Sequence, residues 1–157
     1  MSAEPVVWLS DREQVVWRRL LAVEWRLRER LDEDLRVAHG LSLGDYDVLV
    51  NLAEAEGHAL RMSELAARLL ISRSGLTRRL DGLVKQGVVA RKACPADGRG
   101  SLAELTPAGL ELLAAAAPTH VAGVRHFLID TIEGLDGLAS CLDRIEAALG
   151  HQNGRSG

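Results

Sequence analysis

A set of arginine and hydroxyl side chains lies between positions 72 and 86, where the sequence reads SRSGLTRRLDGLVKQ. Guanidinium groups bind phosphates and guanine edges, and small residues between them permit close approach to a groove. The apolar residues of this segment recur at helical spacing, which predicts a helix with one buried stripe. They are Leu76, Leu80, Leu83 and Val84. The segment therefore predicts a helix whose outer face binds DNA.

The outer face of this helix is polar and partly cationic. At about 100° per residue, the residues opposite the stripe are Ser74, Arg78, Asp81, Gly82 and Lys85, with Thr77 on the flank. Arg73 and Arg79 lie off the centre, although Arg73 is in the first turn, from which a long side chain reaches the same partner. A solvated amphipathic helix is the plainer interpretation of any single arginine. The neighbouring elements favour a DNA-binding role for this helix.

A short helix precedes this segment and joins it through a very short turn, which is the spacing of a helix-turn-helix. We expect Ser63 to cap the first helix and Ser72 to cap the second. The inward residues of the first helix are predicted to be Leu65, Ala66, Leu69 and Leu70.

Two short runs of β-compatible residues, 88–93 and 102–105, follow Gly87 and are separated by the turn-forming sequence CPADGRGS. This pattern predicts a β-wing with Lys92 in a strand and Arg99 at the tip between two glycines. An arginine on such a tip can enter a narrow minor groove. Residues 59–61 are expected to add a minor strand against the hairpin.

The charge of the chain is divided by position. The net charge is −3, but residues 61–104 hold nine Lys and Arg against four Asp and Glu, a local excess of five positive charges. The other residues hold ten cations and eighteen anions. Such asymmetry directs one region of a protein toward phosphate.

Long amphipathic helices are predicted on both sides of this region. Ser10 and Glu13 form a capping-box pattern, and the helix that follows is expected to run to about residue 38, before Gly40. Its length, on the order of 40 Å, exceeds what one small core needs, so part of it should meet a partner chain. Ser42 and Asp45 are expected to cap a helix of about 42–56. Thr106 and Pro107 begin another, which Pro118 should kink or break, and a last helix covers about 132–149.

The whole pattern resembles the MarR family of winged-helix transcriptional regulators. The resemblance is carried by LSL at 41–43, MSELAARL at 62–69, SRSGLTRRL at 72–80, GVV at 87–89 and LTPAG at 105–109. It implies a mainly α fold (α+β, winged helix) in one domain, 1–157, with a DNA-binding lobe at 41–105. Residues 10–40 and 106–150 would form the helical dimerisation body.

The resemblance also implies a homodimer that places its recognition helices in successive major grooves of double-stranded DNA. Repression or activation would be relieved by a small ligand or by cysteine oxidation. We expect the wing to depend on Arg99 alone, because family wings often carry two arginines and this one reads Asp-Gly-Arg-Gly at 97–100. The predicted DNA-binding residues are Ser63, Ser72, Arg73, Ser74, Thr77, Arg78, Arg79, Lys85, Lys92 and Arg99.

An effector pocket of this family would lie where the first, second and fifth helices meet. The candidate residues there are Trp17, Tyr46, His58, His120 and Arg125. Each has a plainer interpretation: a lone histidine on a helix is more often structural, and a tryptophan there more often fills a core or an interface. His120 and His126 are six residues apart and on different faces, which argues against a metal site.

Other functional classes find less support in the sequence. It has no metal motif, nucleophile elbow or phosphate loop, so we expect neither enzymatic activity nor a cofactor. No apolar run approaches a membrane span, which favours a cytoplasmic location. Two alternatives stay open. Cys94 in the wing could act as a redox switch, its thiolate stabilised by nearby cations, or the winged helix could serve protein contacts alone, which its cationic face disfavours.

Overall fold

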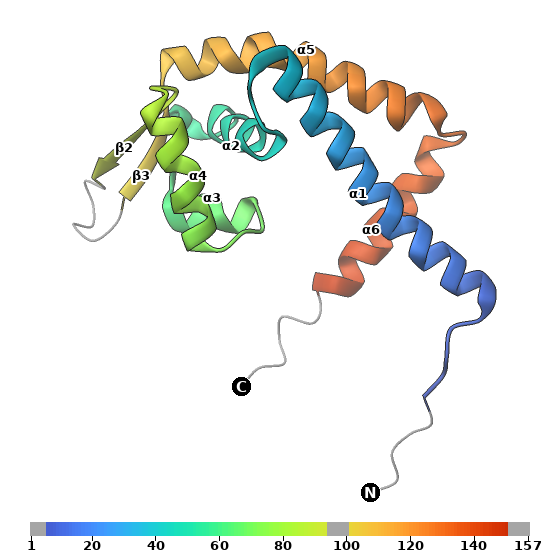
Figure 1. Cartoon of the computed structure of the whole chain (residues 1–157). Helices are drawn as coiled ribbons and strands as arrows, with labels where there is room; N and C mark the ends of the chain where they lie inside the picture. Colours follow the sequence, from blue (N-terminus) through green and yellow to red (C-terminus); the bar gives the residue numbers. More distant parts are fainter. Residues whose placement is uncertain (1–5, 94–100, 151–157) are drawn as a thin grey trace, which may run out of the picture. The chain divides into compact units, whose positions relative to one another are not determined.

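Helices dominate the computed structural model, which describes residues 6–93 and 101–150 (Figure 1). In chain order the elements are α1 (Asp11–His39), α2 (Leu43–Ala53), the 3-10 turn η1 (Glu56–His58), β1 (Ala59–Arg61), α3 (Met62–Arg68), α4 (Arg73–Lys85), β2 (Val89–Ala93), β3 (Ser101–Leu105), α5 (Pro107–Phe127), the 3-10 turn η2 (Ile129–Thr131) and α6 (Leu135–Gly150). The chain divides into two compact units, Met1–Gly123 and Val124–Gly157. The predicted division into a lobe at 41–105 and a two-part helical body stays a prediction.

The signals that begin and end α1 and the signal that begins α2 are confirmed. Ser10 and Glu13 form the reciprocal capping box, with the Ser10 amide donating to Glu13 Oε2 at 2.7 Å. Gly40 ends α1 with φ at 63°, a left-handed conformation that glycine adopts without strain. Ser42 caps α2 by accepting from the Asp45 amide at 3.1 Å. The second helix ends at Ala53, earlier than predicted, and η1 follows.

The helix-turn-helix differs from the prediction at its turn. The first helix, α3, begins at Met62 with Arg61 as its N-cap, so the capping role predicted for Ser63 is wrong. Leu70 was expected to point inward, but it is 91% exposed with φ at 53°. The physical reason is the helix end itself: the Ile71 amide donates to Ala66 O at 3.1 Å, which requires a left-handed residue at position 70.

A three-stranded antiparallel sheet in the order β1-β3-β2 forms the wing and its base. The minor strand predicted at 59–61 is confirmed, with Leu60 opposite Ala103, and Arg91 of β2 faces Ala103 from the other side. The core of this lobe packs leucines and valines from α2, α3, α4 and the sheet. The side chains with almost no exposure are Val48, Leu49, Leu52, Leu65, Leu76, Leu80, Leu83 and Val89, together with Leu35 of α1.

Helix α5 begins as predicted, with Pro107 in its first turn and the Thr106 hydroxyl accepting from the Gly109 amide at 3.1 Å. Pro118 lies inside the continuous helix, so the predicted break does not occur. A proline removes one backbone N–H donor, while the hydrogen bonds of neighbouring turns persist. A bond of 2.8 Å between His39 Nε2 and Thr119 Oγ1 joins α5 to the end of α1. The expectation that no apolar run approaches a membrane span is wrong for the stretch Pro107–Thr131, which is long enough and contains an 18-residue window with a mean hydropathy of 1.2. One such helix is weak evidence for a membrane location.

The second unit contains the end of α5, η2 and α6. Arg125 pairs with Asp130 at 2.6 Å across the turn that ends α5. The last helix begins at Leu135, three residues later than predicted, after Gly134 with φ at 79°. No residue of α6 is buried. An amphipathic helix whose apolar side is exposed to this extent needs a partner surface.

Candidate nucleic-acid interface

Helix α4 presents the outer face that the sequence predicts. Its inner residues Leu76, Leu80 and Leu83 are at most 1% exposed, while Val84, expected in the same stripe, is 37% exposed. The Ser72 hydroxyl caps the helix by accepting from the Gly75 amide at 3.1 Å, which fixes where the first exposed turn begins. The buried stripe therefore determines which side chains of α4 face solvent.

Three cations project from the exposed side of this helix. Arg73, Arg78 and Lys85 are all exposed. Within residues 6–93 and 101–150, no hydrogen bond or ion pair joins any of these three side chains to another residue. Ser74 and Thr77 are exposed between them; Ser74 Oγ lies 3.1 Å from Ser72 Oγ, and the Thr77 hydroxyl donates to the Arg73 carbonyl at 2.9 Å. Unpaired cations beside compact hydroxyl side chains suit a charged, grooved surface such as DNA.

Strand β2 supports α4 through a contact that the sequence analysis did not find. Arg91 donates to the Thr77 carbonyl at 3.1 Å and pairs with Asp81 at 2.8 Å. Fourteen residues separate Arg91 from Thr77, so no local spacing signals this contact. The contact fixes the wing strand to the middle of the recognition helix and uses Asp81, the one anion predicted on the outer face.

The wing residues are only partly described. Lys92 is exposed and pairs with Glu104 of β3 at 2.5 Å across the hairpin. Arg99 and Cys94 lie outside the described residues, so the minor-groove contact and the redox switch predicted there stay predictions. Ser63 is exposed near the start of α3, and its contact with DNA likewise stays a prediction.

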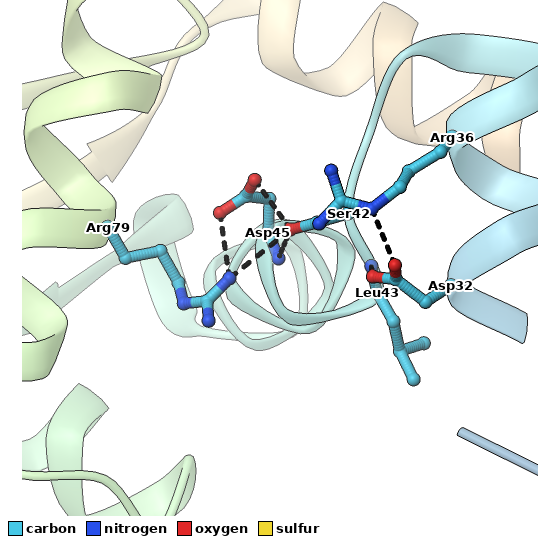
Figure 2. Close-up of polar contacts among 6 residues, drawn as sticks. All are labelled: Asp32, Arg36, Ser42, Leu43, Asp45 and Arg79. Carbon is cyan, nitrogen blue, oxygen red and sulfur yellow. Dashed lines mark hydrogen bonds and ion pairs between the residues drawn. The ribbon is translucent and has the colours of Figure 1, made fainter. Parts of the chain in front are cut away.

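Arg79 lies differently from the other arginines of α4. Figure 2 shows its guanidinium directed at the N-terminus of α2, where Nη1 donates to Asp45 Oδ1 at 3.0 Å and to Ser42 Oγ at 3.3 Å. Its side chain is 33% exposed and that of Asp45 is 25% exposed. The structure thus gives Arg79 partners within the protein, and the DNA contact predicted for it stays a prediction.

Asp32 of α1 continues this group of polar contacts. One carboxylate oxygen accepts from the Leu43 amide at 2.8 Å, and the other accepts from Arg36 Nε at 2.5 Å (Figure 2). Desolvation is the strongest single influence on Asp32 and raises its pKa. The bonds from Arg36 and Leu43, with the nearby charges of Arg36 and Arg79, outweigh it, so the pKa of Asp32 is lowered. The ionised form of Asp32 is therefore the one that the fold holds.

An open hollow of about 400 Å³ lies beside these contacts. It is lined by acidic and basic side chains of α1, by the start of α2 and by Arg79. The lining residues are Glu24, Trp25, Arg28, Glu29, Asp32, Arg36, Ser42, Leu43, Gly44 and Arg79. The sequence analysis found neither Asp32 nor Asp45 as functional candidates. The Ser42–Asp45 spacing signalled a helix cap, but the second partner of Asp45 lies 34 residues away.

Two of the five effector candidates meet. The Tyr46 and His120 rings stack with centroids 4.5 Å apart, joining α2 to α5. Burial raises the pKa of Tyr46 and lowers the pKa of His120, with the charge of Asp47 opposing the shift on His120. Burial also raises the pKa of Asp47 itself. A ring pair held in its neutral form is suited to apolar packing or to a flat ligand.

The other three candidates do not join this pair. Trp17 is 53% exposed on α1. His58 is exposed in η1, where its Nδ1 lies 2.9 Å from the Ala53 carbonyl. Arg125 belongs to the second unit and pairs with Asp130. Their effector roles stay predictions. Among the described residues, no group of three or more His, Cys, Asp or Glu could hold a metal ion.

Comparison with known proteins gives the same fold. The MarR family model matches residues 39–100. Among solved structures, the MarR family regulator AbsC from Streptomyces coelicolor is 40% identical, with 94% of this chain and 100% of that chain covered and a TM-score of 0.87. Sco3205 of the same organism and family, crystallised in complex with DNA, is 36% identical over 97% of this chain and 96% of that one, with a TM-score of 0.88.

A curated relative matches over a shorter region. The HTH-type transcriptional repressor YetL of Bacillus subtilis is 37% identical over 81 residues, which is 52% of this chain and 48% of the repressor. The match thus spans about half the length of that protein. Both regulators from Streptomyces, by contrast, are covered almost completely. On the full-length matches and the winged helix-turn-helix just described, this chain belongs to the MarR family of transcriptional regulators and is not an enzyme.

Proposed function

We propose that this protein is a homodimeric regulator that binds a pseudo-palindromic site in double-stranded DNA through α4 and the wing, and that it acts as a repressor in the cytoplasm. A two-fold dimer places equivalent helices about one helical turn of DNA apart, roughly 34 Å. The related regulator Sco3205 was crystallised with DNA, and YetL is named a repressor.

The observation that carries DNA binding is the set of exposed cations on the outer face of α4 that have no partner among residues 6–93 and 101–150. Arg73 and Arg78 lie in its first two turns, where a recognition helix contacts base edges and phosphates, and Lys85 lies in the last. The opposite stripe is fully buried, so α4 cannot turn this face inward without losing its core packing. In the part of the chain that the structure describes, no carboxylate pairs with these long, exposed guanidinium groups, so they are available to phosphate.

Dimerisation is supported by apolar side chains that each unit leaves exposed. On α1 the first half exposes Val16, Trp17, Leu20, Leu21 and Trp25, each at least half exposed. On α6 the exposed set includes Leu135, Leu142, Ile145 and Leu149. Apolar patches of this kind mark protein interfaces. A second copy of the chain supplies the same surfaces and can cover them by two-fold symmetry.

The proposal also includes release from DNA when a small ligand binds. It is supported by the Tyr46–His120 stack, which joins a lobe helix to α5 at a centroid distance of 4.5 Å. A flat aromatic compound that inserts there would change how α2 meets α5.

The test measures binding to a labelled duplex from upstream of the protein's own gene, by fluorescence anisotropy over a range of salt concentrations. Wild type should bind with a steep salt dependence. The Arg78→Gln variant should weaken binding at least about tenfold and reduce the slope of log K against log salt by about two, because a dimer loses one phosphate contact in each protomer. Arg12→Gln, an exposed arginine in the first turn of α1, is the matched control and should bind like wild type. Absence of binding to every duplex in low salt would refute the proposal.

A further inference from the structure

We infer that Arg79 is a positioning residue, which holds the recognition helix α4 on the N-terminus of α2 instead of contacting DNA. The inference rests on the proposed DNA binding for its functional consequence, but not for its structural test. Three observations carry it: the partners of Arg79, the link from those partners to α1, and the space that a glycine leaves for the guanidinium.

The first observation is the choice of partners. Arg79 Nη1 bonds both Asp45 Oδ1 (3.0 Å) and Ser42 Oγ (3.3 Å), two residues that already form the cap of α2. The Ser42 hydroxyl donates in turn to Asp45 Oδ2 at 2.6 Å. One guanidinium thus closes a ring of bonds on the helix terminus. Charge-assisted bonds at a two-thirds-buried side chain are less screened than those of a surface pair.

The second observation is that this helix terminus is itself anchored. Asp32 of α1 accepts from the Leu43 amide at 2.8 Å, directly beside the cap that Arg79 contacts. The Asp32–Leu43 bond and the bonds of Arg79 to the α2 cap together connect α1, the start of α2 and the middle of α4 (Figure 2). Without Arg79, this polar connection would end at α2, and the orientation of α4 would depend on apolar packing and the Arg91 contact.

The third observation is the room left at Gly44. A Cβ placed at this position would overlap the Arg79 guanidinium group. The backbone of Gly44 does not have a left-handed φ, so its conformation suits any residue. The guanidinium, and not the backbone, is therefore what favours glycine here. This allows a test in which Arg79 is displaced while every charge in the protein is kept.

The consequence concerns sequence recognition more than total affinity. A recognition helix must present its side chains to base edges with sub-ångström accuracy, whereas contacts to phosphates tolerate small rotations. Loss of the Arg79 link should therefore weaken binding to the operator more than binding to an unrelated duplex. The number of phosphates neutralised should not change, so the salt dependence of binding should be preserved.

The experiment compares Arg79→Gln, Gly44→Ala and the double variant with wild type, using Arg78→Gln as the control. Hydrogen–deuterium exchange of the free protein reports whether α4 and the start of α2 loosen. Binding to operator and unrelated duplexes reports the specificity ratio. We expect both single variants to accelerate exchange in residues 42–46 and 73–85 and to reduce the ratio about three- to tenfold with an unchanged salt slope. The double variant should be no worse than Arg79→Gln, because both remove one interaction. In Arg78→Gln, exchange should stay as in wild type.

Two results would overturn the inference. Unchanged exchange in both single variants would show that Arg79 does not hold α4. A salt slope reduced by about two (one phosphate contact per protomer) in Arg79→Gln, with Gly44→Ala binding at least as tightly as wild type, would identify Arg79 as a phosphate contact. If wild type bound no duplex at all, the proposed function would fail, and the exchange measurement alone would still decide whether Arg79 holds the helix.

Discussion

The winged-helix lobe and the first half of α1 use the same apolar residue types in opposite ways. In the lobe, Leu76 and Leu80 of α4 and Leu49 of α2 have no exposed surface. On α1, Leu20 and Leu21 are each half exposed, although their helix is longer and equally amphipathic in sequence. Helix α6, in the second unit, has no buried residue.

This difference teaches that helix formation and core formation are separate requirements. Helix α1 is capped at both ends and continuous over 29 residues, yet within this chain only Leu31 and Leu35, near its C-terminal end, are buried. The lobe closes its core with short elements because three helices and a sheet surround it. Helices α1 and α6 keep apolar surface exposed that can bind a partner chain. The stability of the lobe and the stability of the dimer should therefore respond to different substitutions.

The largest expected effect is on the lobe core. Leu80→Ala removes a fully buried side chain and should lower the free energy of unfolding by about 2–5 kcal/mol, because a cavity adds to the lost burial. Leu20→Ala, on the exposed face of α1, should cost less than about 1 kcal/mol when the protein is monomeric. Urea unfolding at low protein concentration measures both. Equal losses would abolish the distinction between the two regions.

The next largest effect is on self-association, which should depend on the exposed face of α1 and not on the lobe core. Leu20→Asp places a charge on the exposed apolar face of α1 and should weaken self-association by 100-fold or more, roughly 3 kcal/mol, while the monomer keeps its helical content. Analytical ultracentrifugation and circular dichroism measure the two quantities. Arg12→Asp, a charge change at the polar start of the same helix, is the control. An unchanged dimer would remove this face from the interface.

A glycine pair contrasts close packing at the start of α5, against Val88 and Leu105 of the lobe, with open space on α6. A Cβ at Gly109 would collide with the Val88 carbonyl and the Leu105 side chain, so Gly109→Ala should destabilise the protein by about 1–3 kcal/mol. At Gly137 a Cβ meets nothing within 4 Å, so Gly137→Ala should be neutral or stabilising by up to about 1 kcal/mol. Thermal unfolding of both variants tests this. Destabilisation by Gly137→Ala would mean that α6 is packed in solution.

The smallest effect is a pH dependence where α5 meets the lobe. The pKa of His120 is lowered from 6.5 by burial, so below pH 6.5 the unfolded chain binds this proton more readily than the folded one. Stability should therefore fall as the pH falls from 6.5 through the lower folded pKa. Asp47, with a raised pKa, acts in the opposite direction at lower pH. Urea midpoints of wild type and His120→Gln between pH 7 and 5 isolate the histidine. Parallel profiles would assign the dependence to other groups.

Local signals in the sequence predicted much of the fold, because capping and helix termination depend on neighbouring residues. Ser10, Gly40, Ser42, Ser72 and Thr106 all act at the helix ends where their residue types and spacing predicted them. The buried stripe of α4 was also readable, apart from Val84 at its edge. The error at Ser63 arose because α3 begins at Met62, before the serine. The error at Leu70 arose because the same helix ends at Arg68 and closes through a left-handed residue.

The candidate interface was predictable as a surface but not as a set of roles. Periodicity indicated that Arg78 would face outward and Arg79 would lie to one side of the outer face. It did not indicate that Arg79 would bond Asp45, 34 residues earlier, or that Arg91 would bond Asp81 from the wing. Such pairs depend on how separate elements pack, and no residue in either local sequence encodes the distance between them.

By itself, the sequence determined the helices, the turn chemistry, the hairpin and the cationic face, since each follows from the preferences of residues a few positions apart. Only the tertiary structure decided which charges are free and which are used within the protein. It left Arg73 and Arg78 exposed and paired Arg79 with the cap of α2. The physical reason is that an ion pair requires two side chains to be within a few ångströms of each other, and that proximity is created when the elements pack, not when they form.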